Sequence, residues 1–252
     1  MPAVALTMLS VFSVAIDRFD VPAALEDLTA PERARAGRFR HQGARRAFIV
    51  MRHALRRVLA DRLGVAAGEV AVLLSGYGKP SVASGPFFCL SHSADKGLLA
   101  ISEAGPIGVD IEQPNRLNES DDPIALARTA FHPHEVDWLT SLPVSARMPA
   151  FYAIWCRREA LLKAAGVGIA VDPSCLLTDS AGQATAPVWF QPPIGPADEE
   201  WRRHAAAGQL TPSGGPDWWV RDLEVDGIPA AIAGIGDMPS DDEIVVEDFG
   251  SV

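Results

Sequence analysis

Two carboxylates stand two residues apart in an otherwise apolar stretch, Ile107-Gly108-Val109-Asp110-Ile111-Glu112. The stretch is typical of a β-strand, whose successive side chains point to opposite faces, so Asp110 and Glu112 are expected on one face, about 7 Å apart along the backbone. Gly108 shares that face and is expected to leave space beside them. Neighbouring carboxylates repel each other unless a positive charge lies between them, and oxygen ligands favour a hard cation such as magnesium. An edge strand with a solvent-exposed polar face is the alternative, and this fragment alone does not choose between them.

A second charged set lies in residues 151–165, which have the composition of a helix. Trp155, Glu159 and Lys163 are spaced four residues apart and therefore form one stripe along that helix, with Arg158 beside it. The stripe is either part of a charged site or a solvent-exposed ion pair, which would contribute only about 0.3–0.5 kcal/mol.

Residues 33–62 contain ten arginines and one acidic residue, although the whole chain carries a net charge of −10. The preceding segment, Thr29-Ala30-Pro31-Glu32, has the pattern of a capping box with proline in the first helical turn. Apolar residues then recur at helical spacing, which predicts an amphipathic helix over residues 43–63 with arginines on its polar face. These arginines form either a solvated helix surface or a phosphate-binding wall, because guanidinium groups match phosphate oxygens.

Short strands separated by turns surround the Asp-x-Glu segment. The pattern predicts strands over residues 9–16, 70–75, 87–91, 98–102 and 107–112. Residues 191–215, rich in proline, glycine and alanine, are interpreted as a variable loop or insertion. Residues 236–252 carry six acidic side chains and no basic one, and are predicted to be a disordered acidic tail.

Composition excludes several classes of protein. With 252 residues, 48% of them hydrophobic and 21% charged, the chain is expected to fold into one large or two smaller domains. Its negative charge argues against bulk binding to nucleic acid or to an anionic membrane, and it has no run of about 18 apolar residues that could span a membrane. Three cysteines without paired spacing indicate reduced thiols in a cytoplasmic protein. His132 and His134 lack a third nitrogen or sulfur ligand nearby, which disfavours zinc.

Taken together, five motifs resemble those of the Sfp-type 4′-phosphopantetheinyl transferases, in the family's order and near its spacing, over about 90 residues. They are Gly78-Lys79-Pro80, Phe88-Cys89-Leu90-Ser91-His92-Ser93, Gly108-Val109-Asp110-Ile111-Glu112, Phe131 with Glu135, and the segment from Trp155 to Gly166. Two positions depart from the family's pattern. Gly43-Ala44-Arg45-Arg46 stands where an acidic residue followed three positions later by arginine is usual, and Arg158 stands where lysine is common.

The resemblance implies transfer of the 4′-phosphopantetheine arm from coenzyme A to a serine of an apo acyl or peptidyl carrier protein, with Mg²⁺ and release of 3′,5′-ADP. It also implies an α+β fold of two similar half-domains, residues 1–113 and 114–235, with the active site in the cleft between them. Such a chain is expected to act as a monomer. Carriers of fatty-acid, polyketide and nonribosomal-peptide biosynthesis are all open as substrates.

The resemblance also assigns residues. Asp110, Glu112 and Glu159 are the expected magnesium ligands, and Asp110, Glu159 and Lys163 are the expected catalytic residues. Contacts with coenzyme A are expected from Lys79, Ser91, His92, Arg158, Lys163 and Arg46.

The expected chemistry agrees with these residue types. Attack of a serine hydroxyl on the β-phosphate moves charge onto phosphate oxygens, which the metal and Lys163 would neutralise. Either Glu159 or a metal-bound water could remove the serine proton. A magnesium-dependent phosphohydrolase is one alternative, although no further acidic cluster for a second metal is found near Asp110. A non-catalytic homologue that only binds carrier proteins is the other, although all three expected metal ligands are present.

Overall fold

The structure is a computed structural model that describes residues 9–114, 122–167, 176–178, 189–190 and 218–250. Its first elements are β1 (Leu9–Ala15), α1 (Val21–Glu26), α2 (Ala30–Ala36), α3 (Gln42–Leu63), β2 (Val72–Leu74), β3 (Pro80–Val82), β4 (Phe87–Ser93), β5 (Lys96–Ser102) and β6 (Ile107–Ile111). They are followed by α4 (Pro123–Ala130), α5 (Pro133–Ser141), α6 (Val144–Ala165), β7 (Leu176–Leu177), β8 (Trp189–Phe190), β9 (Trp218–Val225), β10 (Ile228–Ile235) and β11 (Val246–Asp248). Short 3₁₀ turns lie at Ile16–Arg18, Ala67–Glu69 and Asp241–Glu243.

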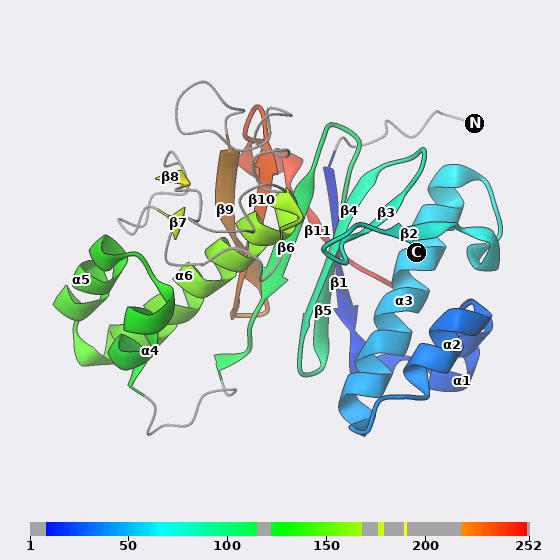
Figure 1. Ribbon diagram of the computed structural model, residues 1–252, viewed down its shortest axis with the longest axis horizontal. Helices are drawn as coiled ribbons and strands as arrows, with labels where there is room; N and C mark the ends of the chain where they lie inside the picture. The colour runs from blue at the N-terminus through cyan, green and yellow to red at the C-terminus, as the bar shows by residue number, and fades with distance from the viewer. Residues whose placement is uncertain (1–8, 115–121, 168–175, 179–188, 191–217, 251–252) are drawn as a thin grey trace.

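Two sheets form the centre of the molecule (Figure 1). Their strands are antiparallel, except that β11 pairs in parallel with β1 at the edge of the first sheet. The first has the order β11-β1-β5-β4 and the second the order β6-β10-β9. Apolar side chains of the two sheets share one core, which includes Val11, Leu98, Val109 and Ile232. The long helices pack on the other faces, α3 on the first sheet and α6 on the second. The fold is therefore α+β, as predicted.

The hydrogen-bonded strands cross the predicted half-domain boundary. Strand β6, which precedes residue 113, pairs with β10, and β11, which follows residue 235, pairs with β1. Two strands are therefore exchanged between the two parts of the chain, and the division into two similar half-domains stays a prediction.

The five strand predictions and the helix predicted over residues 43–63 are confirmed within a few residues at each end, and the helix predicted over residues 151–165 is confirmed at its C-terminal end. The largest difference is α6, which begins at Val144 rather than near Phe151 and contains Pro149 in its second turn. Pro149 is the sixth residue of α6, beyond the four amides that a helix start leaves unpaired, so the Ser145 carbonyl loses its helical donor there. The predicted loop over residues 191–215 lies outside the described residues. Within those residues, no helix combines the length and apolar character needed to cross a membrane.

The predicted disordered tail is wrong for residues 236–250. Strand β11 pairs in parallel with β1, with Val246 opposite Val11, and the amide of Phe249 donates to the Ser13 carbonyl at 2.8 Å. The Phe249 ring stacks on Phe19 with 5.6 Å between centroids. Acidic composition alone was misleading, because the apolar residues between the acids supply the contacts that hold this segment on the first sheet.

Truncation of the chain after residue 237 is expected to lower its melting temperature. The cut removes the pairing of β1 with β11 and the burial of Phe249, a loss of about 2–3 kcal/mol or roughly 5–10 °C for a chain of this size. Thermal unfolding followed by circular dichroism measures the effect. The full-length Glu247→Gln variant is the control, because it removes one exposed charge and keeps the strand. Equal melting temperatures for the truncated and full-length chains would contradict this packing.

Candidate active site

Gly108 determines how closely α6 approaches β6. A Cβ atom at this position would lie 1.9 Å from the Ala160 carbonyl oxygen and 2.4 Å from the Ala164 amide nitrogen. The space expected beside the carboxylates is therefore filled by the backbone of α6. As the alternation predicts, Ile107 and Val109 face the shared core, while Gly108 and Asp110 face the helix. This close contact brings the polar stripe of α6 to the acidic residues of β6.

Asp110 is the centre of the polar cluster and is only 3% exposed. Its Oδ1 accepts hydrogen bonds from Ser91 Oγ at 2.7 Å and from Lys163 Nζ at 2.5 Å, and Lys163 Nζ also donates to Ser91 Oγ at 2.8 Å. Burial would lower the pKa of Lys163, but the negative charge of Asp110 outweighs it, so the pKa is raised and the ammonium stays charged. Asp110 Oδ2 is buried and has no hydrogen-bond partner among the described residues.

Two serines of β4 hold the two acids of the Asp-x-Glu motif. Ser93 Oγ donates to Glu112 Oε2 at 2.9 Å, in parallel with the bond from Ser91 to Asp110. Ser93 Oγ in turn accepts from the Gln113 amide at 3.0 Å. Ser93 was not among the predicted site residues, although the period-two alternation of a strand places it on the same face as Ser91.

Glu159 lies one helical turn before Lys163, at the edge of this cluster. Burial raises its pKa, the nearby Lys163 lowers it, and the negative charges of Asp110 and Glu112 raise it further. All three acids therefore act on one another electrostatically. Among the described residues, however, no three histidine, cysteine, aspartate or glutamate side chains are close enough together to form a complete metal site as they stand.

Cys156 contacts the same region from α6. Its thiol donates to the Pro229 carbonyl at 3.3 Å. Burial, followed by the charges of Asp110 and Glu112, raises its pKa far above the ordinary value, so the thiol stays protonated. Cys156 packs in the apolar contact between α6 and β10.

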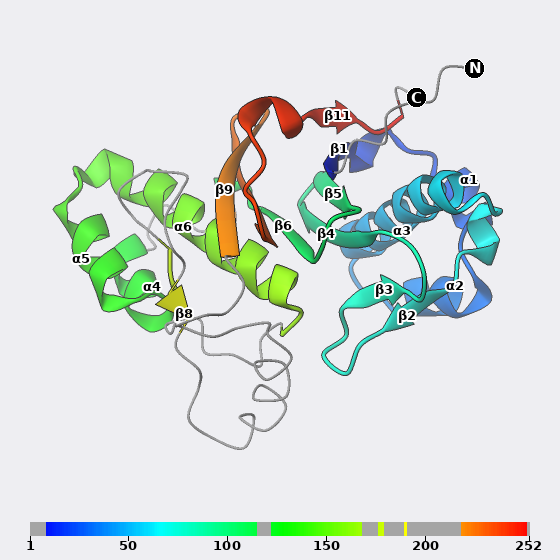
Figure 2. The same ribbon diagram turned by 90° about the horizontal axis from the view of Figure 1, so that it is seen from above.

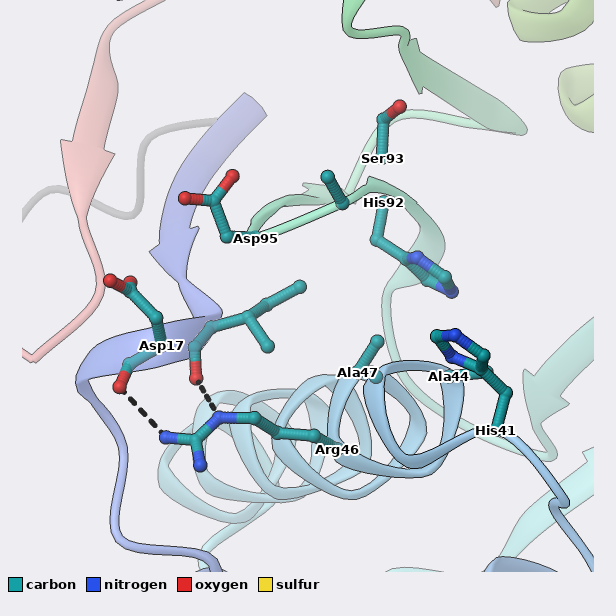
Figure 3. Close-up of a pocket in the computed structure, with 11 residues that line it drawn as sticks. Asp17, His41, Ala44, Arg46, Ala47, His92, Ser93 and Asp95 are labelled. Carbon is teal, nitrogen blue, oxygen red and sulfur yellow. Dashed lines mark hydrogen bonds between the residues drawn. The ribbon is translucent and has the colours of Figure 1, made fainter. Parts of the chain in front are cut away.

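His92, the residue between the two serines, points from the opposite face of β4 into a cavity of about 560 Å³ (Figure 3). The rings of His92 and His41 approach each other across this cavity, and Ala44 and Ala47 of α3 form its floor. Arg46 lines it too, but its guanidinium donates to main-chain carbonyls at Ile16, Asp17 and Phe19, at 3.0, 2.8 and 2.6 Å. Arg46 therefore holds the chain after β1 against α3.

The side chain of Lys79 lies against the C-terminal end of α6. Its Nζ donates to the carbonyls of Ile107 at 3.1 Å and Ala164 at 2.9 Å, and burial lowers its pKa. The side chain lines a separate cavity of about 510 Å³ next to Gly166. Lys79 thus ties the start of β6 to the end of α6, and the structure does not bring its ammonium group to Asp110.

Arg158, one residue before Glu159, points into the protein interior. It is 2% exposed and forms an ion pair with Glu135, which is fully buried. Glu135 Oε1 also accepts from the amide and hydroxyl of Thr178 at 2.8 and 2.6 Å, and the Arg158 guanidinium lies 5.3 Å from the Phe131 ring centroid. The Phe131 and Glu135 motif therefore anchors α5 to α6. His132 caps the start of α5, with its Nδ1 accepting from the His134 amide at 3.3 Å.

Comparison with known proteins shows which family this chain resembles. The sequence model of the 4′-phosphopantetheinyl transferase superfamily matches residues 106–207. The chain is 36% identical over 190 residues to the 4′-phosphopantetheinyl transferase HetI of Nostoc sp. strain PCC 7120, covering 72% of this chain and 79% of that protein. It is also 33% identical over 115 residues to the transferase gsp of Aneurinibacillus migulanus, covering 46% of each chain, and 30% identical over 158 residues to psf-1 of Bacillus pumilus, covering 61% and 65%.

These likenesses and the resemblance of the motifs define a transferase. The chain belongs to the 4′-phosphopantetheinyl transferase family, so the enzyme class predicted from its motifs is confirmed.

Proposed function

We propose that this chain transfers the 4′-phosphopantetheine arm of coenzyme A to a serine of an apo acyl or peptidyl carrier protein, with Mg²⁺ and release of 3′,5′-ADP. The observation that carries the proposal is the cluster of Ser91, Asp110 and Lys163, in which a cation and a carboxylate meet at the contact between β4, β6 and α6. Such a cluster suits a reaction in which charge develops on phosphate oxygens.

The acidic residues fit a magnesium ion in their donor chemistry. Asp110 Oδ2 is buried without a hydrogen-bond partner among the described residues, and Glu112 and Glu159 add only oxygen donors. Asp110, Glu112 and Glu159 would hold the ion. When bound, it would supply positive charge to the pyrophosphate oxygens of coenzyme A.

The chain's own residues account for the remaining steps. Lys163 keeps its charge because its pKa is raised, and its ammonium can donate to a phosphate oxygen as the ester bond to the serine forms. Glu159 is a candidate acceptor for the serine proton, because its carboxylate lies one helical turn before Lys163 at the same cluster. We place the phosphates of coenzyme A at Ser91, Lys163 and the His92 cavity. Arg46, Lys79 and Arg158 would act by positioning the surrounding elements.

A mass-shift assay tests the proposed function. The purified chain is incubated with coenzyme A, Mg²⁺ and each member of a panel of apo carrier proteins. One phosphopantetheine arm should be added per carrier, and a carrier whose acceptor serine is replaced by alanine should gain nothing. Cleavage of coenzyme A without a carrier would favour the phosphohydrolase. Binding of carrier without any metal-dependent mass gain would favour the non-catalytic homologue.

The Lys163→Ala variant is expected to lower kcat by at least about 10²-fold while the KM for the carrier changes little. The ammonium group stabilises charge that develops during transfer, and such an interaction acts on turnover. Steady-state kinetics with varied carrier concentration measures both constants. Lys96→Ala is the matched control, because Lys96 forms a 2.5 Å ion pair with Asp226, a residue whose side chain is 64% exposed. An effect of Lys163→Ala on carrier affinity alone would contradict the proposed role.

A further inference from the structure

Ser93 is a buried polar residue that the proposed reaction does not use directly. It is the last residue of β4 and is only 1% exposed. Ser93 borders the His92 cavity, but Figure 3 shows its hydroxyl directed away from the His92 ring. A buried hydroxyl is costly unless it is hydrogen-bonded, so its partners indicate what it does.

The hydrogen bonds of Ser93 fix the direction of its hydroxyl group. Ser93 Oγ accepts from the Gln113 amide at 3.0 Å and lies 2.9 Å from Glu112 Oε2. A hydroxyl carries a single proton, and an amide N–H can only donate, so the proton of Ser93 is directed to the Glu112 carboxylate. Gln113 is held in turn, because its Nε2 donates to Asp95 Oδ1 in the turn after β4 at 2.6 Å.

Glu112 benefits from a partner of this kind. It directly follows the end of β6 at Ile111, and its amide donates to the Pro229 carbonyl at 3.0 Å, which holds the backbone. Its long side chain loses rotamer freedom worth up to about 1.5–2 kcal/mol when it is fixed in one orientation. Strands β4 and β6 lie side by side in Figure 2, which lets Ser93 hold that side chain from the neighbouring strand.

We infer that Ser93 is a positioning residue that orients Glu112 toward the magnesium ion and thereby sets the metal affinity of the site. The inference rests on the proposed magnesium site of Asp110, Glu112 and Glu159. Hydrogen-bond partners of metal-binding carboxylates typically contribute roughly 10–100-fold to metal affinity. A ligand that is already oriented loses less entropy when the ion binds, so the loss of Ser93 should weaken metal binding rather than the transfer step itself.

Titration of the full-length protein with MnCl₂ in the presence of coenzyme A tests this inference. Mn²⁺ prefers the same oxygen ligands as Mg²⁺, and the electron paramagnetic resonance signal of free Mn²⁺ measures binding without turnover. Ser93→Ala should weaken Mn²⁺ binding by roughly tenfold or more. Ser102→Ala is the matched control, because Ser102 is 6% exposed on β5 and accepts from the amides of Ala104 and Gly105 at 3.2 and 3.3 Å. Its Mn²⁺ affinity should stay within about twofold of the parent.

Transfer assays at varied Mg²⁺ concentration provide a second measurement. In Ser93→Ala the Mg²⁺ concentration for half-maximal activity should rise by a similar factor, while kcat at saturating Mg²⁺ stays within about threefold of the parent. Equal Mn²⁺ affinity in Ser93→Ala and the parent would overturn the inference alone, as would a loss of kcat that excess Mg²⁺ does not restore. Absence of Mn²⁺ binding by the parent protein would refute the proposed magnesium site, and this inference with it.

Discussion

Replacement of Asp110 by asparagine is expected to lower the rate of phosphopantetheine transfer by at least about 10³-fold. Asparagine has nearly the same shape, so the hydrogen bond from Ser91 can persist, but the charge that faces Lys163 is lost. We propose the buried Oδ2 as a magnesium ligand, and in asparagine this position belongs to a neutral amide instead of a charged carboxylate. Single-turnover transfer to an apo carrier measures the activity, and titration of Mg²⁺ in the presence of coenzyme A measures the metal affinity, which should fall as well.

Asp222→Asn is the matched control for this variant. Asp222 also pairs with a basic residue of α6, through bonds from Arg157 at 2.5 and 2.6 Å, but its side chain is 46% exposed and lies outside the polar cluster. Its activity should stay within about threefold of the parent, because the pair lies outside the polar cluster, although loss of the carboxylate that faces the buried Arg157 should lower stability. Near-normal turnover and metal dependence in Asp110→Asn would refute the magnesium assignment, provided that circular dichroism shows a folded variant.

Gly108→Ala is expected to cause the largest loss of stability among single substitutions at this site. The added methyl group would overlap backbone atoms of Ala160 and Ala164, and a backbone cannot move aside as the end of a flexible side chain can. Helix α6 would have to shift away from β6, at a cost of about 3 kcal/mol or more, which corresponds to roughly 6–12 °C in melting temperature. Activity should fall as well, because the same shift moves Lys163 away from Asp110.

Gly105→Ala provides the comparison. Gly105 lies in the turn just before the same strand, and no atom lies within 4 Å of the position that its Cβ would occupy. Its stability should stay within about 0.5 kcal/mol of the parent, as is usual for an unhindered surface position. Chemical denaturation of both variants tests the pair. Equal stability of Gly108→Ala and Gly105→Ala would show that the close contact between β6 and α6 is not required.

Local periodicity explains why most of the fold could be predicted. The alternation in residues 107–111 correctly placed Asp110 on the face opposite Val109, and the spacing in residues 151–165 correctly placed Glu159 and Lys163 on one stripe. The spacing of apolar residues likewise predicted the long helix α3, which the structure confirms. Which side chains share a face depends only on the side-chain periodicity of one helix or strand, so the local sequence is enough to predict it.

Contacts between elements were not predictable in the same way. Arg158 and Lys163 are basic residues of one helix, and the family resemblance implied a contact with coenzyme A for both. The structure places Lys163 against Asp110 and Arg158 in a buried pair with Glu135. Ser93 was missed for the same reason, because its role depends on Glu112 of another strand.

The sequence by itself determined the family, five of the strands and the two long helices, and the residue types of a site for phosphoryl chemistry. Only the tertiary structure decided which cation meets which carboxylate, that Gly108 lets α6 rest on β6, and that residues 236–250 pack on the first sheet. The physical reason is the range of the interactions. Side-chain periodicity acts within one element, whereas ion pairing, close backbone contact and strand pairing join residues that are distant in the chain.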